Sequence, residues 1–320
     1  CLAPIVSTQP SWFYVMVIVT VLLLTELKHT FTEFAQRMKN DEMITLAKFL
    51  AISGIILPML PHKNLIPDIN LTPYSIWLAT VVVSGISYLS YLLKRYVFHE
   101  SGVLVSGIIG GLYSSTATIS VLARKSRKAS EQEANEYVAA MLLAVSMMFL
   151  RFMILILIFS REIFTSIYPY LLIMSAVVAW FIHSRHRRSK DMTDESEDED
   201  SSNPLEFKVA LIFATLFVVF TVLTHYTLVY AGTGGLNLLS FVSGLSDITP
   251  FILNLLQNTG SVAVLVVVAC SMQAIISNIL VNMFYALFFA GKGSKLRPWI
   301  LGGFGTVIGV NLVLLLFFYL

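Results

Sequence analysis

Charge is what this sequence lacks most. Only 12% of its 320 residues are Asp, Glu, Lys or Arg, about half the share of an ordinary soluble domain. By contrast, 57% of the residues are hydrophobic and the mean hydropathy is +0.79. A chain with so few charges cannot cover so much apolar surface in water. The composition therefore predicts an all-α, polytopic membrane protein.

Cysteines and catalytic motifs are also scarce. Cys1 and Cys270 are too few for a disulfide framework, and neither stands in a metal-ligand spacing. The sequence contains no HExxH, no GxSxG and no phosphate-binding loop, and "GLYSSTA" has no His or Asp at a useful nearby position. We therefore expect no enzyme and no cofactor.

Apolar runs near the length of a membrane crossing, about 20 residues, occur ten times. They are residues 11–27, 43–60, 75–94, 103–122, 135–160, 163–183, 206–230, 235–257, 262–290 and 297–319. Two of them, 103–122 and 235–257, carry glycines and hydroxyl groups at their centres. These two segments raise the question whether they cross the membrane at all.

The positive charges answer that question, because Lys and Arg accumulate on cytoplasmic loops. If all ten segments cross, the basic residues divide evenly between the two sides. If segments 103–122 and 235–257 each enter and leave by one face, 18 of the 21 basic residues become cytoplasmic. Only Lys63 and Arg161 then lie outside, and Arg151 lies within the membrane. The sequence therefore predicts about eight transmembrane helices plus two re-entrant helical hairpins.

In the first hairpin, residues 103–111 are expected to descend to the membrane midplane and residues 115–124 to return. Gly110 and Gly111 permit a sharp turn there. The next residues, Ser114, Ser115 and Thr116, are types that cap a returning helix.

The second hairpin can be aligned with the first. Gly111 matches Gly244, Ser114 falls on Asp247, and Thr116 matches Thr249, which is expected to cap a helix with Pro250 in first position.

The helices that follow the hairpins also correspond, "AVSMMFLR" against "IISNILVN". This alignment places Ser146 on Ser277 and Arg151 on Asn282. With the predicted topology, the chain becomes an inverted repeat of the kind that secondary transporters use. We expect a first repeat with an additional helix at 43–183, a charged cytoplasmic linker at 184–205, and a second, inverted repeat at 206–320.

Two charged residues remain deep in the membrane, Arg151 and Asp247, and such residues are functional candidates by default. We expect Arg151 to pair with Asp247 at the hairpin tips, either as part of a binding site or as an ion pair that locks the repeats together. The candidate substrate- or ion-binding residues are Gly110, Gly111, Ser114, Ser115, Thr116, Ser146, Arg151, Gly244, Ser246, Asp247, Thr249, Ser277, Asn278 and Asn282.

The charge of the bound species stays open. Helix N-termini at the midplane suit an anion, whereas Asp247 with hydroxyl and amide oxygens suits a cation such as Na⁺ or Mg²⁺. His225 is a candidate proton carrier, although its neighbours Tyr226 and Tyr230 favour a place at the outer membrane interface.

The motifs "GIIGGLYSSTATISVLARKSR", "AVSMMFLR" and "FVSGLSDITPFILNLL" resemble the C-terminal uncharacterised membrane domain, domain of unknown function 4010, of MgtC/SapB-type bacterial membrane proteins. Residues 1–42 then resemble the end of a preceding MgtC-like region, with a last helix and an amphipathic segment, so the chain is expected to lack most of that region. The sequence departs from the pattern at Asn282, where many relatives carry a basic residue. The resemblance implies a multi-pass protein of the bacterial inner membrane and an association with Mg²⁺ homeostasis, but no established activity.

Two classes of function follow from these observations. The first is a transporter or channel for a small ion or solute, and the second is a non-transporting regulator or structural partner of other membrane proteins. The expected partners are the lipid bilayer and a small ion or solute, a homo-oligomer is allowed, and no nucleic acid is expected.

Overall fold

A computed structural model describes residues 18–22, 25, 28, 40–67, 69–98, 102–128, 131–185, 207–257, 262–291 and 296–319. Within these ranges the chain is helical, with no β-strand and a single isolated bridge between Ile66 and Ile69. The predicted all-α class is confirmed for this part of the chain. The predicted segment 11–27, the amphipathic segment and the linker 184–205 lie largely outside the described residues.

The chain divides into two units, Cys1–Ile52 and Ser53–Leu320. The first unit contains helix α3, Asn40–Ala51, after which the π-helical turn Ile52–Ile56 leads into the short helix α4, Leu57–Met59. The candidate site lies entirely in the second unit.

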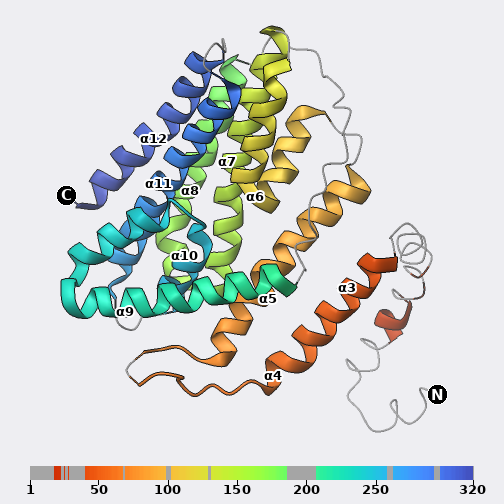
Figure 1. Cartoon of the computed structure of the whole chain (residues 1–320), viewed down its shortest axis with the longest axis vertical. Helices are drawn as coiled ribbons and strands as arrows, with labels where there is room; N and C mark the ends of the chain where they lie inside the picture. Colours follow the sequence, from red (N-terminus) through yellow and green to blue (C-terminus); the bar gives the residue numbers. More distant parts are fainter. Residues whose placement is uncertain are drawn as a thin grey trace. The chain divides into compact units, whose positions relative to one another are not determined.

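The second unit is built from eight longer helices (Figure 1). They are α5 (Pro73–Leu92, continued by the π-helical turn Leu93–Val97), α6 (Val103–Lys125, followed by the 3-10 turn Ser126–Lys128), α7 (Glu131–Phe159), α8 (Arg161–Arg185), α9 (Phe207–Ser243), α10 (Ile248–Gln257), α11 (Val264–Ala290) and α12 (Arg297–Tyr319). Across the described part of the chain, 8 helical stretches are long and apolar enough to cross a membrane, which confirms the predicted multi-pass class. They are residues 42–59 and helices α5, α6, α7, α8, α9, α11 and α12, whereas α10 is too short.

Helix α6 does not run straight. Its backbone leaves the helical region at Ser114, with φ −158° and ψ 106°. A Cβ atom placed on Gly110 would lie 2.5 Å from the side-chain oxygen of Thr118, although residues eight apart in a straight helix are separated by about 12 Å along its axis. The arms 103–113 and 115–125 therefore fold back on one another (Figure 1).

Helix α9 changes direction at Gly232, whose φ of 59° lies in the left-handed region that glycine tolerates best. Its second arm, 233–243, ends in a turn at 244–247, and the chain returns as α10, which packs against α9. The predicted segment 235–257 is therefore two helices joined by a turn. The first of them follows the predicted helix 206–230 directly, because only the backbone break at Gly232 separates the two arms of α9.

Small residues allow segments 103–125 and 233–257 to pack closely against the long helix that follows each of them. Gly107 lies against Ala140 and Gly111 against Ala144. In the second half, Ser240 donates to Gln273 and Gly244 lies against Ser277, with the same separation of 33 residues. The arm 103–113 of α6 therefore runs parallel to α7, and the arm 233–243 of α9 runs parallel to α11. Small residues allow the close backbone approach in both places.

The second arm of α6 is anchored to the end of α11. The Arg127 side chain donates to the carbonyl oxygens of Phe288 and Phe289, and the Arg124 guanidinium lies 4.3 Å from the centre of the Phe289 ring. Because α6 turns back, its basic end and the end of α11 lie at one end of the helix bundle.

This packing makes a test with matched glycines possible. A Cβ on Gly111 would lie 2.5 Å from the Ala144 backbone, and a Cβ on Gly244 would lie 2.3 Å from the Ser277 Cβ, whereas one on Gly305 in α12 meets nothing within 4 Å. We expect Gly111→Ala and Gly244→Ala to lower the thermal unfolding temperature by several degrees, because helix backbones must move apart. Gly305→Ala should leave it unchanged or raise it. Equal melting temperatures for all three variants in a fluorescence-detected unfolding assay would contradict this packing.

Candidate solute site between two helix breaks

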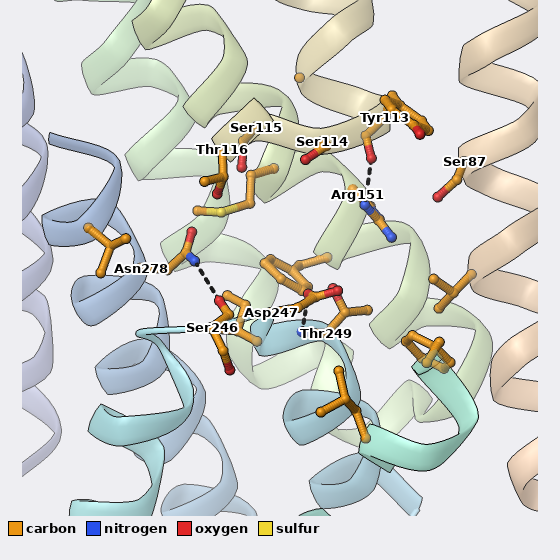
Figure 2. Close-up of a pocket in the computed structure, with 18 of the residues that line it drawn as sticks. Ser87, Tyr113, Ser114, Ser115, Thr116, Arg151, Ser246, Asp247, Thr249 and Asn278 are labelled. Carbon is orange, nitrogen blue, oxygen red and sulfur yellow. Dashed lines mark hydrogen bonds between the residues drawn. The ribbon is translucent and has the colours of Figure 1, made fainter. Parts of the chain in front are cut away.

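A cavity of about 400 Å³ lies between the α6 break and the turn that joins α9 to α10 (Figure 2). Side chains of α5, α7, α11 and the beginning of α9 complete its wall. The polar and charged lining residues are Ser84, Ser87, Tyr113, Ser114, Ser115, Thr116, Arg151, Ser246, Asp247, Thr249, Asn278 and Tyr285. This volume falls within the usual range for small-molecule sites, about 300–1,000 Å³.

Arg151 holds the first break from helix α7. One of its terminal nitrogens donates to the carbonyl oxygen of Tyr113 at 3.1 Å, while its buried Nε has no hydrogen-bond partner. Ser114 lies directly after that carbonyl, and its hydroxyl accepts from the backbone N–H of Ala117 at 3.4 Å. The second arm of α6 therefore begins at the cavity with a serine cap, as the sequence predicted for Ser114.

Asn278 holds the second turn from helix α11 in the same way. Its side-chain amide donates to the carbonyl oxygens of Gly244 and Ser246, at 3.3 and 3.4 Å (Figure 2). The Asp247 carboxylate accepts from the backbone N–H of Thr249 at 2.9 Å and so caps α10.

The predicted cap of this helix is therefore wrong. Helix α10 begins at Ile248, so Thr249 and Pro250 are its second and third residues, and Asp247 is the cap. A carboxylate accepts a hydrogen bond more strongly than a hydroxyl and also favours the positive end of the helix dipole, which explains the preference.

The predicted direct contact between Arg151 and Asp247 is not formed. Both side chains line the cavity and face it from different walls, with no ion pair between them (Figure 2). Arg151 instead binds a backbone carbonyl of the first half. Opposite charges therefore share one cavity and leave space between them.

Nine of the 14 predicted site residues line this cavity. They are Gly111, Ser114, Ser115, Thr116, Arg151, Ser246, Asp247, Thr249 and Asn278. The structure thus brings together residues from four separated stretches of the sequence, in α6, in α7, at the α9–α10 turn and in α11.

The other five predicted residues lie behind the cavity wall. Gly110 packs against Thr118, and Gly244 packs against Ser277, which is fully buried. Ser146 is buried on α7 away from the lining. Asn282, also fully buried, donates to the side-chain oxygen of Asn278 at 3.1 Å and so supports a lining residue.

The sequence analysis missed the contribution of α5. Ser84 and Ser87 line the cavity, and Thr80, Ser84, Ser87 and Tyr91 are all buried on this helix. Their spacing of three and four residues places them on one helical face. A polar stripe along an apolar helix was the signal that could have identified them.

His225 does not line the cavity. Its ring lies against that of Tyr226, which in turn stacks on Tyr230, and both tyrosines are exposed on α9. Exposed tyrosines on an apolar helix are typical of the membrane interface. The structure therefore favours the interfacial interpretation of His225 over a proton-carrying role in the cavity.

The walls offer both kinds of electrostatic partner. The second arm of α6 and helix α10 both begin at the cavity, where free backbone N–H groups favour negative charge, although Asp247 already occupies the start of α10. Within the described ranges, no group of three or more His, Cys, Asp or Glu side chains could hold a metal ion. The arrangement can bind a small polar solute through one cation, one carboxylate and several hydroxyls.

The chain is similar to a known protein family and to an uncharacterized relative. The family model described as "Domain of unknown function (DUF4010)" matches residues 81–290. An uncharacterized protein of Aquifex aeolicus (strain VF5) is 27% identical over 217 residues, covering 67% of this chain and 94% of the relative. No solved structure matches. Neither match carries an MgtC/SapB description, so that part of the resemblance stays a prediction.

If water reaches the cavity, cysteines on its wall will react with a small charged methanethiosulfonate reagent. We expect Ser114→Cys and Thr116→Cys to react at least about tenfold faster than Ser271→Cys, because Ser271 is 1% exposed and lies outside the lining. The unchanged protein measures the background from its own two cysteines, Cys1 and Cys270. Equal protection of all three engineered cysteines would mean that the cavity is closed to water.

Proposed function

The chain belongs to the DUF4010 family, and we propose that it is an integral membrane transporter or channel for a small ion or solute. One observation carries the proposal: oppositely charged Arg151 and Asp247 line one cavity between two helix breaks without pairing. A charge within a membrane costs at least a few kcal/mol. Each charge also binds backbone at a helix break, and because the two are not joined in a direct ion pair, both remain available to a bound solute.

The directions of the helices support an inverted arrangement of two re-entrant hairpins. Thr116 and Asn278 both line the cavity, and eleven residues further on Arg127 contacts Phe289, so the second arm of α6 runs parallel to α11. The same arm runs antiparallel to its partner arm, which is parallel to α7. Helices α7 and α11 therefore run in opposite directions. Because the first arm of each hairpin is parallel to its following helix, the two hairpins are also oriented in opposite directions.

Equivalent contacts at the two tips strengthen this proposal. The Tyr113 carbonyl accepts from Arg151, and the Ser246 carbonyl accepts from Asn278. One residue further on, Ser114 and Asp247 each cap the returning helix. The two halves thus satisfy the same backbone groups in the same order.

The contacts also revise the register of the proposed repeat. The glycines Gly111 and Gly244 seat on Ala144 and Ser277, whereas the sequence alignment placed Ser146 on Ser277. The contacts therefore pair Ala144 with Ser277, two residues before the Ser146 that the sequence alignment pairs with Ser277. In the contact register, Arg151 does not correspond to Asn282.

The arm lengths fit a site near the middle of a bilayer. Eleven helical residues in the first arm of α6 and ten in α10 rise about 15 Å, roughly half the hydrocarbon thickness. We place the basic ends of α6 and α11 on the cytoplasmic side of a bacterial inner membrane, following the positive-inside rule. Neither re-entrant segment would then cross.

Transport can be measured in proteoliposomes with a panel of Na⁺, K⁺, Mg²⁺, Cl⁻ and labelled small solutes. We expect flux through the unchanged protein, and a loss of at least about tenfold in Arg151→Gln and in Asp247→Asn, because each removes one charged contact. Ser175→Ala is the matched control, since Ser175 bonds its own helix outside the cavity. Absence of flux for the whole panel would favour the non-transporting regulator.

Sided labelling tests the re-entrant topology separately. We expect Arg124→Cys and Arg297→Cys, both at exposed positions, to react with an impermeant thiol reagent in inside-out vesicles. Lys63→Cys should react in right-side-out vesicles. If α6 and the 235–257 segment both cross instead, Arg124→Cys will react from the same side as Lys63→Cys, and the hairpin proposal fails.

A further inference from the structure

The two charges in the cavity are opposite in sign and incompletely partnered. Arg151 donates to the Tyr113 carbonyl, and its Nε has no partner. Asp247 accepts from the Thr249 N–H and faces the cavity. Asp247 is exposed at the cavity wall and Arg151 is half-buried, and opposite charges that face one cavity attract each other.

A single bound ion would match only one of these charges. An anion next to Arg151 would leave Asp247 uncompensated, and a cation next to Asp247 would leave Arg151 uncompensated. Either ion would therefore be attracted by one wall of the cavity and repelled by the other. A solute with both charges compensates both walls at once and leaves the site neutral.

The two helix N-termini at the cavity are not equivalent. The start of α10 is occupied by the carboxylate of Asp247. The start of the second α6 arm has only the neutral Ser114 hydroxyl, at a long 3.4 Å, and Arg151 contacts the carbonyl directly before it. At the start of α10 the protein itself supplies the negative group, Asp247. The start of the second α6 arm has no negative group of the protein and can accept one from the solute.

We propose that the cavity binds a small zwitterion with one carboxylate and one ammonium group, the chemical class of the amino acids. The carboxylate lies at Arg151 and the start of the second α6 arm, and the ammonium group lies at Asp247. This inference rests on the proposed function and names its solute class.

The size and lining of the cavity fit this class. Its volume of about 400 Å³ is within the usual range for small-molecule sites, about 300–1,000 Å³, and is enough for an amino acid with a short side chain. Hydroxyls of Ser87 and Thr116 can bind the polar groups, and Val83 and Phe213 supply apolar wall. The mixed lining argues against a bare inorganic ion.

Binding to the purified full chain tests the proposal through ligand-induced thermal stabilisation. The probes are the standard amino acids and 4-aminobutyrate, each compared with its deaminated acid and its decarboxylated amine. We expect at least one zwitterion to bind ten times more tightly, or better, than both of its single-charge analogues. NaCl, MgCl₂ and sodium sulfate are the inorganic comparisons.

Two variants separate the two ends of the solute. Asp247→Asn should abolish the preference for the zwitterion over its deaminated acid, and Arg151→Gln should abolish the preference over the amine. Ser175→Ala should keep both preferences. Because each variant is predicted to lose a different preference, general misfolding cannot imitate the pattern.

Three results would overturn the inference: no binding by any zwitterion, binding of an analogue as tight as that of the zwitterion, or stabilisation by inorganic ions alone. If ion flux in proteoliposomes persists without zwitterion binding, the transport proposal stands and the zwitterion inference fails. If a zwitterion binds but no probe is transported, the site is real and the transport proposal fails.

Discussion

A helix that stops within a membrane leaves backbone N–H and C=O groups that lipid cannot satisfy, and each such group costs several kcal/mol. The proposed membrane arrangement depends on how this constraint is met at two helix breaks. Arg151 and Asn278 reach from long helices to the carbonyls at the breaks, and Ser114 and Asp247 bind the N–H groups that follow. The same four side chains then form much of the polar wall of the cavity. The side chains that satisfy the backbone groups at the two breaks are thus the same ones that line the proposed solute site.

Close packing keeps the breaks where those side chains can reach them. Gly111 rests on Ala144 and Gly244 on Ser277, at distances that leave no room for a side chain. Because lipid is as apolar as the helices, such packing rather than a hydrophobic driving force holds membrane helices together. In the first folded segment, Gly107 and Gly111 allow close contact with α7, whereas Gly110 allows the two arms of α6 to approach each other. The chain reverses direction at Ser114, not at the glycines.

Much of this could be predicted from the sequence, because it depends on composition and on local residue types. Low charge and repeated apolar runs predicted the helical membrane class, and the aligned tips brought Ser114 and Asp247 to equivalent caps. What failed depends on geometry between helices. The predicted direct contact between Arg151 and Asp247 was wrong because a carbonyl of the first half lies within reach of Arg151.

In the proposed arrangement, two helix breaks that enter from opposite membrane faces meet at one hydrated cavity. A cryo-EM map of the chain in a lipid nanodisc tests it most directly, because the bilayer density gives the depth of each segment. We expect residues 112–116 and 244–249 to lie near the bilayer midplane and both ends of α6 to lie at the same membrane face. A continuous α6 with its two ends at opposite faces would contradict it.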